Sequence, residues 1–216
     1  MSKPRNVDMK CLMNLGRYLK GRQRVIDKFD HQKNWKIMDT WSDTDHAGCL
    51  RTRKSTNGGV ALFGNHCIKG WSTTQAVLAL SSGEAEFYCI VKGASIGIGL
   101  RSVYKDLGVS LEIEMYTDSS AAKGIAHRKG LGKVRHLETN QLWIQEKVAN
   151  KDIDLQKVCG TDNIADALTK YVSKDELVWH SNKICQQTEL GRHSLAPQLE
   201  EGEEHQRYES EEEEEE

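Results

Sequence analysis

The chain has 216 residues, of which 38% are hydrophobic and 29% charged, and its formal net charge is −2 at pH 7. This length suits one principal folded domain with extensions, and the composition is that of an ordinary globular protein. No run of about 18 apolar residues is present and the start of the chain is polar, so we expect neither a membrane span nor a secretory signal. We therefore expect no membrane partner and an intracellular protein, cytoplasmic or nuclear, that is not secreted.

The charge is distributed unevenly along the chain. The segment from Glu200 to Glu216 is almost entirely acidic, so the rest of the chain is basic. A basic body suits a polyanionic partner such as nucleic acid. Residues 198–216 contain too few apolar side chains to fold, and we expect them to form a disordered acidic tail. The six cysteines form no Cys-x-x-Cys pair, which argues against a zinc site and a disulfide framework.

The first expected elements are a helix and a strand. Lys10 to Gly21 places apolar residues at helical spacing and ends at a glycine, as an amphipathic helix would. Trp35 to Ser42 is rich in residues that favour strands and is followed directly by Asp43 and Asp45. The sequence therefore predicts carboxylates at the C-terminal end of the first strand.

A hairpin and a long helix are expected next. Two short apolar runs, Gly58 to Phe63 and Cys67 to Trp71, are joined by a Gly-Asn-His turn, which predicts two antiparallel strands. Ser81 and Glu84 have the spacing of a capping box, in which the serine accepts a backbone N–H and the glutamate bonds to the serine's own N–H. A helix should therefore begin at about Ser82 and end near Leu107.

Strands and helices alternate in the second half of the chain. The expected elements are a strand at Ile113 to Thr117, a short helix from Ser119, a helix at His136 to Ala149, a strand at Ile153 to Val158 and a last helix around Asp166. Asp118 directly follows the first of these strands. The whole order predicts an α/β fold with a mixed five-stranded sheet and helices on its faces.

Four carboxylates are candidates for a metal site that hydrolyses phosphodiesters. Such a site needs hard oxygen ligands converging from separate elements, and two Mg²⁺ ions held by them can activate water and stabilise charge on the phosphate. The candidate catalytic and metal-binding residues are Asp43, Glu86, Asp118 and Asp166. Asp45 could replace Asp43, and Glu84 could replace Glu86, although the helix cap accounts for Glu84.

Six sequence blocks, in order and at compatible spacing, resemble one known family. They span about Trp35 to Tyr171 and are SDTDHAG (Ser42 to Gly48), RKSTNGGVALFG (Arg53 to Gly64), SSGEAEF (Ser81 to Phe87), YTDSSAA (Tyr116 to Ala122), KVRHLE (Lys133 to Glu138) and NIADALTK (Asn163 to Lys170). Together they resemble the ribonuclease H domain of copia-type retrotransposon Pol polyproteins. The resemblance implies a ribonuclease H-like fold, two Mg²⁺ ions for which Mn²⁺ can substitute, and cleavage of the RNA strand in RNA–DNA hybrids.

The same resemblance suggests a division of the chain. Residues 1–34 resemble the end of a polymerase connection, residues 35–171 would form the ribonuclease H domain, and residues 172–197 a helical extension before the tail at 198–216. The chain would then be a C-terminal fragment that lacks its reverse transcriptase, and a reverse transcriptase domain becomes a possible partner beside the RNA–DNA hybrid.

Further residues are candidates for binding the hybrid. Ser81 and Ser82 resemble the family's phosphate-binding position, and the start of a helix suits an anion. The other candidates for substrate binding are Ser120, Lys133, Arg135 and His136. Caps and a solvated basic loop are the alternative explanations for these residues.

Three functions compete at this point. The chain could be an RNA–DNA hybrid endonuclease, a catalytically inactive nucleic-acid-binding remnant of a transposon, or a DNA-cutting nuclease of the same fold. Retention of all four acids favours the hybrid endonuclease.

Overall fold

The computed structural model describes residues 5–33, 36–132, 136–137 and 141–196. The chain forms two compact units, one of Asp27–Gln187 and the other of Met1–Ile26 together with Thr188–Glu216. The domain boundaries expected from the sequence stay a prediction, and the acidic tail lies outside the described residues. No helix in the described ranges is long and apolar enough to cross a membrane.

Helix α1 (Asn6–Gly21) belongs to the smaller unit and begins four residues before the expected position. None of its residues is buried. Two strands that the sequence did not predict, β1 (Arg24–Asp27) and β7 (Gln186–Glu189), pair as a two-stranded sheet. Both are four residues long, too short for a clear alternating pattern.

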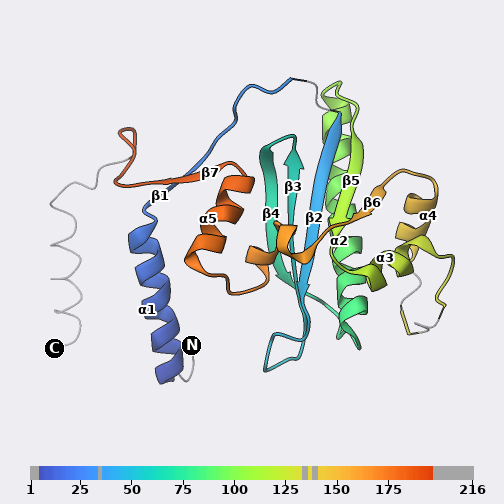
Figure 1. The fold of residues 1–216 in the computed structure, drawn as a ribbon, viewed down its shortest axis with the longest axis horizontal. Coiled ribbons are helices and arrows are strands. Elements are labelled where there is room, and N and C mark those ends of the chain that lie inside the picture. The colour runs from blue at the N-terminus through green and yellow to red at the C-terminus, as the bar shows by residue number, and fades with distance from the viewer. Residues whose placement is uncertain (1–4, 34–35, 133–135, 138–140, 197–216) are drawn as a thin grey trace, which may run out of the picture. The chain divides into compact units, whose positions relative to one another are not determined.

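The larger unit is built on a five-stranded sheet (Figure 1). Its strands are β2 (Ile37–Asp45), β3 (Thr56–Phe63), β4 (His66–Thr74), β5 (Glu112–Thr117) and β6 (Asp154–Lys157). The spatial order is β4-β3-β2-β5-β6; β2, β3 and β4 are antiparallel, and β5 and β6 continue parallel to β2. Gly64 closes the β3–β4 turn at a φ of 59°, as the predicted hairpin requires. The predicted α/β class, a mixed five-stranded sheet with helices on its faces, is confirmed.

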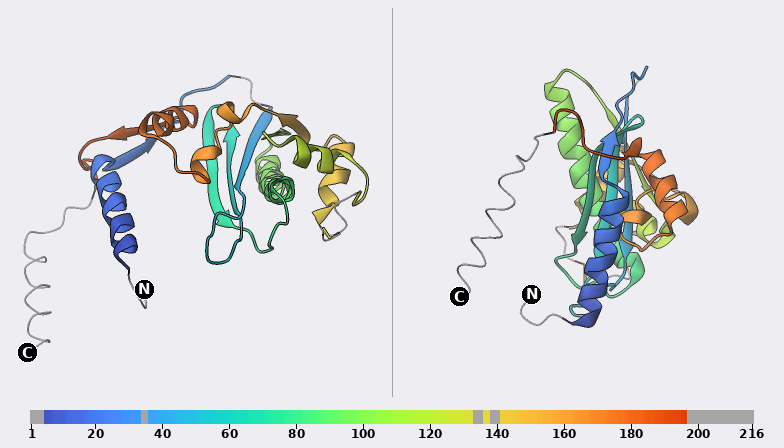
Figure 2. Two further views of the ribbon diagram at one scale, coloured as in Figure 1. Left: turned by 60° about the horizontal axis from the view of Figure 1, so that its bottom comes forward. Right: turned by 90° about the vertical axis from the view of Figure 1, so that its left-hand side faces the viewer.

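Helices cover both faces of this sheet (Figure 2). On one face lie α2 (Ser82–Asp106), α3 (Ser120–His127) and α4 (Trp143–Ala149), around a core that includes Phe87, Ile90 and Met115. On the other face, Val60 and Leu62 of β3 pack with residues of the turn η3 (Asp166–Leu168) and of α5 (Lys174–Lys183). Residues two apart on a strand share a face, which explains how β3 serves this second core.

Three expected elements differ from the structure. Strand β2 continues through Asp43 and Asp45 instead of ending before them. Helix α4 begins at Trp143, and neither His136 nor Leu137 is helical. The predicted last helix around Asp166 was wrong, because this residue begins a three-residue 3₁₀ turn.

Gly59 should be intolerant of any side chain. A Cβ at this position would lie 2.6 Å from the backbone oxygen of Trp41 and would overlap the ring of Trp71, whereas a Cβ at Gly70 on the neighbouring strand would meet nothing within 4 Å. We expect Gly59→Ala to lower the free energy of unfolding by about 1–3 kcal/mol, the usual cost of overpacking. Gly70→Ala is the matched control and should change it by less than about 0.5 kcal/mol. Urea denaturation measures both, and equal effects would contradict the expected overlap.

Candidate metal centre

Three of the four predicted carboxylates meet at one edge of the sheet. Asp43 lies two residues before the end of β2, and Asp118 directly follows β5. Glu86 lies in the first turn and a half of α2. Each offers an oxygen, and the three oxygens lie within 4.8 Å of one another. The parallel pairing of β2 with β5 brings their C-terminal ends together, and α2 packs on the same two strands. Residues far apart in sequence therefore form one acidic cluster.

Asp43 is the innermost of these acids, with only 1% of its surface exposed. Its carboxylate accepts hydrogen bonds from the hydroxyl of Thr169 and, at 3.3 Å, from Nζ of Lys170. The same Lys170 ammonium lies 2.9 Å from Oδ1 of Asp166. Asp166 is thus joined to the cluster through Asp43 and Lys170, although it is not one of the three acids whose oxygens converge.

The electrostatics of the cluster favour a bound cation. Burial, followed by the charges of Asp43 and Asp118, raises the pKa of Glu86 to about 9. Burial and the charge of Asp43 also raise the pKa of Asp118. For Asp166, burial raises the pKa more than the hydrogen bond from Lys170 lowers it. Oε2 of Glu86 is buried and has no hydrogen-bond partner among the described residues. Like charges that repel one another and an unpartnered oxygen fit the hard-oxygen donor set of Mg²⁺.

The structure distinguishes Asp43 from Asp45 and Glu86 from Glu84, the alternatives that the sequence left open. Asp45 is partly exposed, and its carboxylate packs against Gly48 in the turn after β2. It does not belong to the group of three converging carboxylates. Glu84 is buried like Asp43, but its carboxylate is occupied by other partners. The geometry therefore places Asp43 and Glu86 in the cluster in preference to Asp45 and Glu84.

Glu84, in the first turn of α2, forms a hydrogen bond with His136, which lies between α3 and α4. Its carboxylate accepts hydrogen bonds from the backbone N–H of Leu80 (3.0 Å), from the hydroxyl of Tyr88 (2.9 Å) and from Nε2 of His136 (2.7 Å). Burial opposes its ionisation, but the hydrogen bonds from His136, Leu80 and Tyr88 outweigh burial and lower the pKa of Glu84. The expected capping box is half correct, because Ser81 does accept from the Glu84 N–H while the glutamate bonds to Leu80 instead of to Ser81.

The predicted substrate-binding residues occupy different positions around the centre. Ser81 is the N-cap of α2, and Ser82 is the exposed first residue of that helix. Ser120 is the exposed first residue of α3, which Ser119 caps. His136 is half-exposed and pairs with Glu84. Lys133 and Arg135 lie outside the described residues, so their role stays a prediction.

Sequence reasoning missed Thr169 and Lys170 as members of the site. Both belong to the NIADALTK block, but a threonine and a lysine have no strong preference for metal centres. The signal that could have found Lys170 is its position four residues after Asp166, the spacing at which opposite charges meet on a helical turn.

Comparison with known proteins supports the resemblance that the motifs indicated. A scan against protein-family models finds no match. The chain is 28% identical over 160 residues to the Retrovirus-related Pol polyprotein from transposon TNT 1-94 of Nicotiana tabacum, covering 73% of the chain and 12% of that polyprotein. It is 27% identical over 187 residues to the polyprotein from transposon RE1 of Arabidopsis thaliana, covering 85% of the chain and 13% of that polyprotein. The chain thus spans about an eighth of the length of these relatives.

Solved structures with a similar arrangement include ribonuclease H domains. The N-terminal RNase H domain of Rv2228c from Mycobacterium tuberculosis is 16% identical with a TM-score of 0.44, covering 68% of this chain and 96% of that chain. Prototype foamy virus protease-reverse transcriptase is 15% identical with a TM-score of 0.38, covering 68% and 22%. At TM-scores below 0.5 these likenesses add nothing to the fold assignment, which depends on the mixed sheet itself. By sequence, the chain is similar to part of the Pol polyproteins of these retrotransposons, in agreement with the resemblance that its motifs indicated.

Proposed function

We propose that this chain is a ribonuclease H, an endonuclease that hydrolyses the RNA strand of RNA–DNA hybrids with two bound Mg²⁺ ions. The observation that supports it most is the convergence of Asp43, Glu86 and Asp118 from three separate elements, with ligand oxygens within 4.8 Å. Among the described residues, no cysteine or histidine belongs to this group. An all-carboxylate set suits Mg²⁺, with Mn²⁺ as a substitute, better than it suits zinc.

The four acids have distinct parts in this proposal. Asp43, Glu86 and Asp118 would hold one ion, and Asp43 with Asp166 would hold the other. Bound metal ions supply an activated water and neutralise charge on the phosphate and on the leaving oxygen. Thr169 and Asn163 position the ligands: Thr169 donates to Asp43, and Asn163 joins its own turn to β2 through Ser42.

The choice of an RNA–DNA hybrid as substrate rests on the relationship to retrotransposon polyproteins, because a carboxylate cluster alone would suit any phosphodiester. Exposed serines stand at the starts of α2 and α3: Ser82 is four residues before Glu86, and Ser120 is two residues after Asp118. They offer hydroxyls and helix N–H groups to phosphates. A reverse transcriptase domain is the proposed protein partner, as the Pol relatives imply.

Cleavage assays test this proposal directly. The purified chain should cut labelled RNA in an RNA–DNA hybrid in the presence of Mg²⁺ but not of EDTA, and should leave double-stranded DNA and double-stranded RNA intact. The Asp118→Asn variant is the inactive control. Hybrid binding without cleavage by the unmodified chain would instead identify an inactive binding module, and cutting of duplex DNA would identify a different nuclease.

A further inference from the structure

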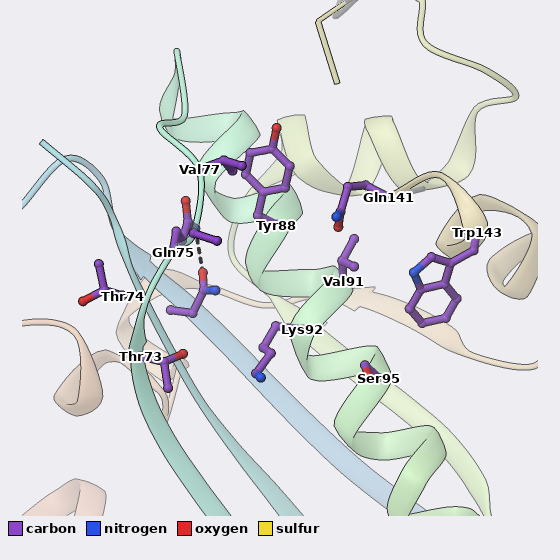
Figure 3. A pocket seen from close by; sticks show the side chains of 12 residues that line it. Thr73, Thr74, Gln75, Val77, Tyr88, Val91, Lys92, Ser95, Gln141 and Trp143 are labelled. Carbon is purple, nitrogen blue, oxygen red and sulfur yellow. Dashed lines mark hydrogen bonds between the residues drawn. The ribbon is translucent and has the colours of Figure 1, made fainter. Parts of the chain in front are cut away.

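A groove of about 720 Å³ crosses the outer surface of α2, away from the carboxylate cluster (Figure 3). Four residues of α2 form its floor: Tyr88, Val91, Lys92 and Ser95. One side is the chain from Thr73 to Val77 that leads from β4 to α2, and the other side is Gln141 and Trp143 at the start of α4. All of these segments belong to the larger unit.

Helix geometry places this groove on the opposite side of α2 from Glu86. Each helical residue advances the side chain by about 100°, so Tyr88, Lys92 and Ser95 point roughly 180–240° away from Glu86. Ser95 is nine residues beyond Glu86, about 14 Å along the helix axis. One turn of duplex is about 34 Å long. A one-turn hybrid centred on the carboxylates therefore extends only about 17 Å to either side and ends at the margin of the groove, whereas a two-turn hybrid extends about 34 Å to either side and passes it.

The lining of the groove suits a phosphodiester strand. Lys92 is the one charged residue among the described residues that line it, and no carboxylate does. The hydroxyls of Thr73, Thr74 and Ser95 and the amide of Gln141 are groups that commonly contact phosphates and sugars. Trp143 adds an aromatic ring of the kind on which bases or sugars pack. A single cation among neutral donors is complementary to a polyanion.

Gln75 gives the groove an unsatisfied polar atom. Its side chain is 3% exposed, and its Nε2 donates to Oδ1 of Asn57 (2.6 Å) and to the backbone oxygen of Ala85 (2.8 Å). The backbone oxygen of Ala85 can only accept, so a flip of the Gln75 amide would lose that bond and place two oxygens against each other. Oε1 of Gln75 is left buried with no partner among the described residues. A ligand that brings a hydroxyl or amino donor, such as a ribose or a base, would satisfy it.

The floor of the groove is held by the network around Glu84. Tyr88 donates to the buried carboxylate of Glu84, which also accepts from His136. The position of the Tyr88 ring is therefore fixed by a hydrogen bond, and a fixed lining favours binding of a defined ligand.

We propose that this groove binds one sugar-phosphate strand of the hybrid at a distance from the cleavage site, with Lys92 against a phosphate and Trp143 against a base or sugar. The inference rests on the proposed function, since it takes the hybrid as the ligand. It adds a second contact that only a sufficiently long hybrid can make. Lys92 should therefore contribute to the affinity for a long hybrid but not to the affinity for a short one.

Binding can be measured without cleavage in an Asp118→Asn background by fluorescence anisotropy, with hybrids of about one and about two helical turns. Lys92→Ala should weaken binding of the long hybrid about three- to tenfold and lower the salt slope by about one, as expected for one lost phosphate contact. The short hybrid should bind unchanged. Trp143→Phe, which keeps an aromatic ring at the start of α4, should weaken the long hybrid less than Lys92→Ala does.

Lys105→Ala is the matched control, because Lys105 is an exposed lysine near the end of the same helix and does not line the groove. Equal affinities of the Lys92 and Lys105 variants for the long hybrid would overturn the groove proposal. Cleavage of the short hybrid by the unmodified chain reports on the carboxylate centre separately. The groove proposal can therefore fail while the proposed nuclease stands, and loss of all cleavage identifies failure of the nuclease instead.

Discussion

Asp43→Asn should lower the rate of hybrid cleavage by about a thousandfold or more, which corresponds to about 4 kcal/mol of lost transition-state stabilisation. Asp43 is the acid that lies between Glu86 and Asp118 on one side and Asp166 on the other. An amide in its place keeps the shape of the side chain but removes the charge that both proposed ions would share. Single-turnover cleavage at saturating Mg²⁺ measures the effect.

The matched control is Asp45→Asn, two residues along the same strand. Asp45 faces the turn at Gly48 and is not among the convergent oxygens, so its variant should retain activity within about twofold of the unmodified chain. Circular dichroism and hybrid binding should show that both variants fold. A larger loss for Asp45→Asn than for Asp43→Asn would reverse the assignment of the β2 ligand.

Glu86→Gln should stabilise the metal-free protein at pH 8, by up to roughly 5 kcal/mol (3.5 pH units at about 1.36 kcal/mol each), even as it removes a proposed ligand. Burial and the neighbouring carboxylates hold the pKa of Glu86 at about 9 in the folded chain, against an ordinary value of 4.5. Between these values the folded state keeps a proton that the unfolded state has lost, so the stability of the metal-free protein falls as pH rises from about 5 to 9. A glutamine, which never ionises, removes this dependence.

Urea denaturation in EDTA across this pH range measures the change, and Glu84→Gln is the contrasting variant. Glu84 is equally close to the start of α2, but its hydrogen bonds from His136, Leu80 and Tyr88 lower its pKa. Its ionised form therefore stabilises the fold above about pH 4.5, and Glu84→Gln should cost about 1–3 kcal/mol at neutral pH. Stability changes of the same sign for the two glutamine variants would contradict the opposite environments described for these glutamates.

Much of the fold could be predicted from local patterns. The capping serine before α2, the glycine turn between β3 and β4 and the apolar runs are signals that neighbouring residues provide by themselves. The short elements could not be predicted in this way. Strands β1 and β7 are four residues each and mostly exposed, and the turn at Asp166 is set by packing of Ile164 and Leu168 against β3 instead of by helical periodicity.

The acids of the site could be predicted because each follows or begins a recognisable element. Their partners could not. Glu84 and His136 are 52 residues apart, and Asn163 and Ser42 are 121 apart, so nothing in either local sequence indicates the contact. Lys170 could be placed near Asp166 by spacing, but its approach to Asp43 depends on how the η3 turn packs on the sheet.

The position of Lys170 also bears on how this protein folds before any of the proposed ions binds. Its ammonium lies within hydrogen-bond distance of Asp166 and close to Asp43, and these two acids raise its pKa although burial opposes this. The lysine therefore acts as a resident counter-ion that offsets repulsion within the pocket before any divalent ion arrives. The sheet can therefore fold without a bound ion, and an ion that takes Asp43 as a ligand, as the proposed function requires, would compete with this lysine for that carboxylate.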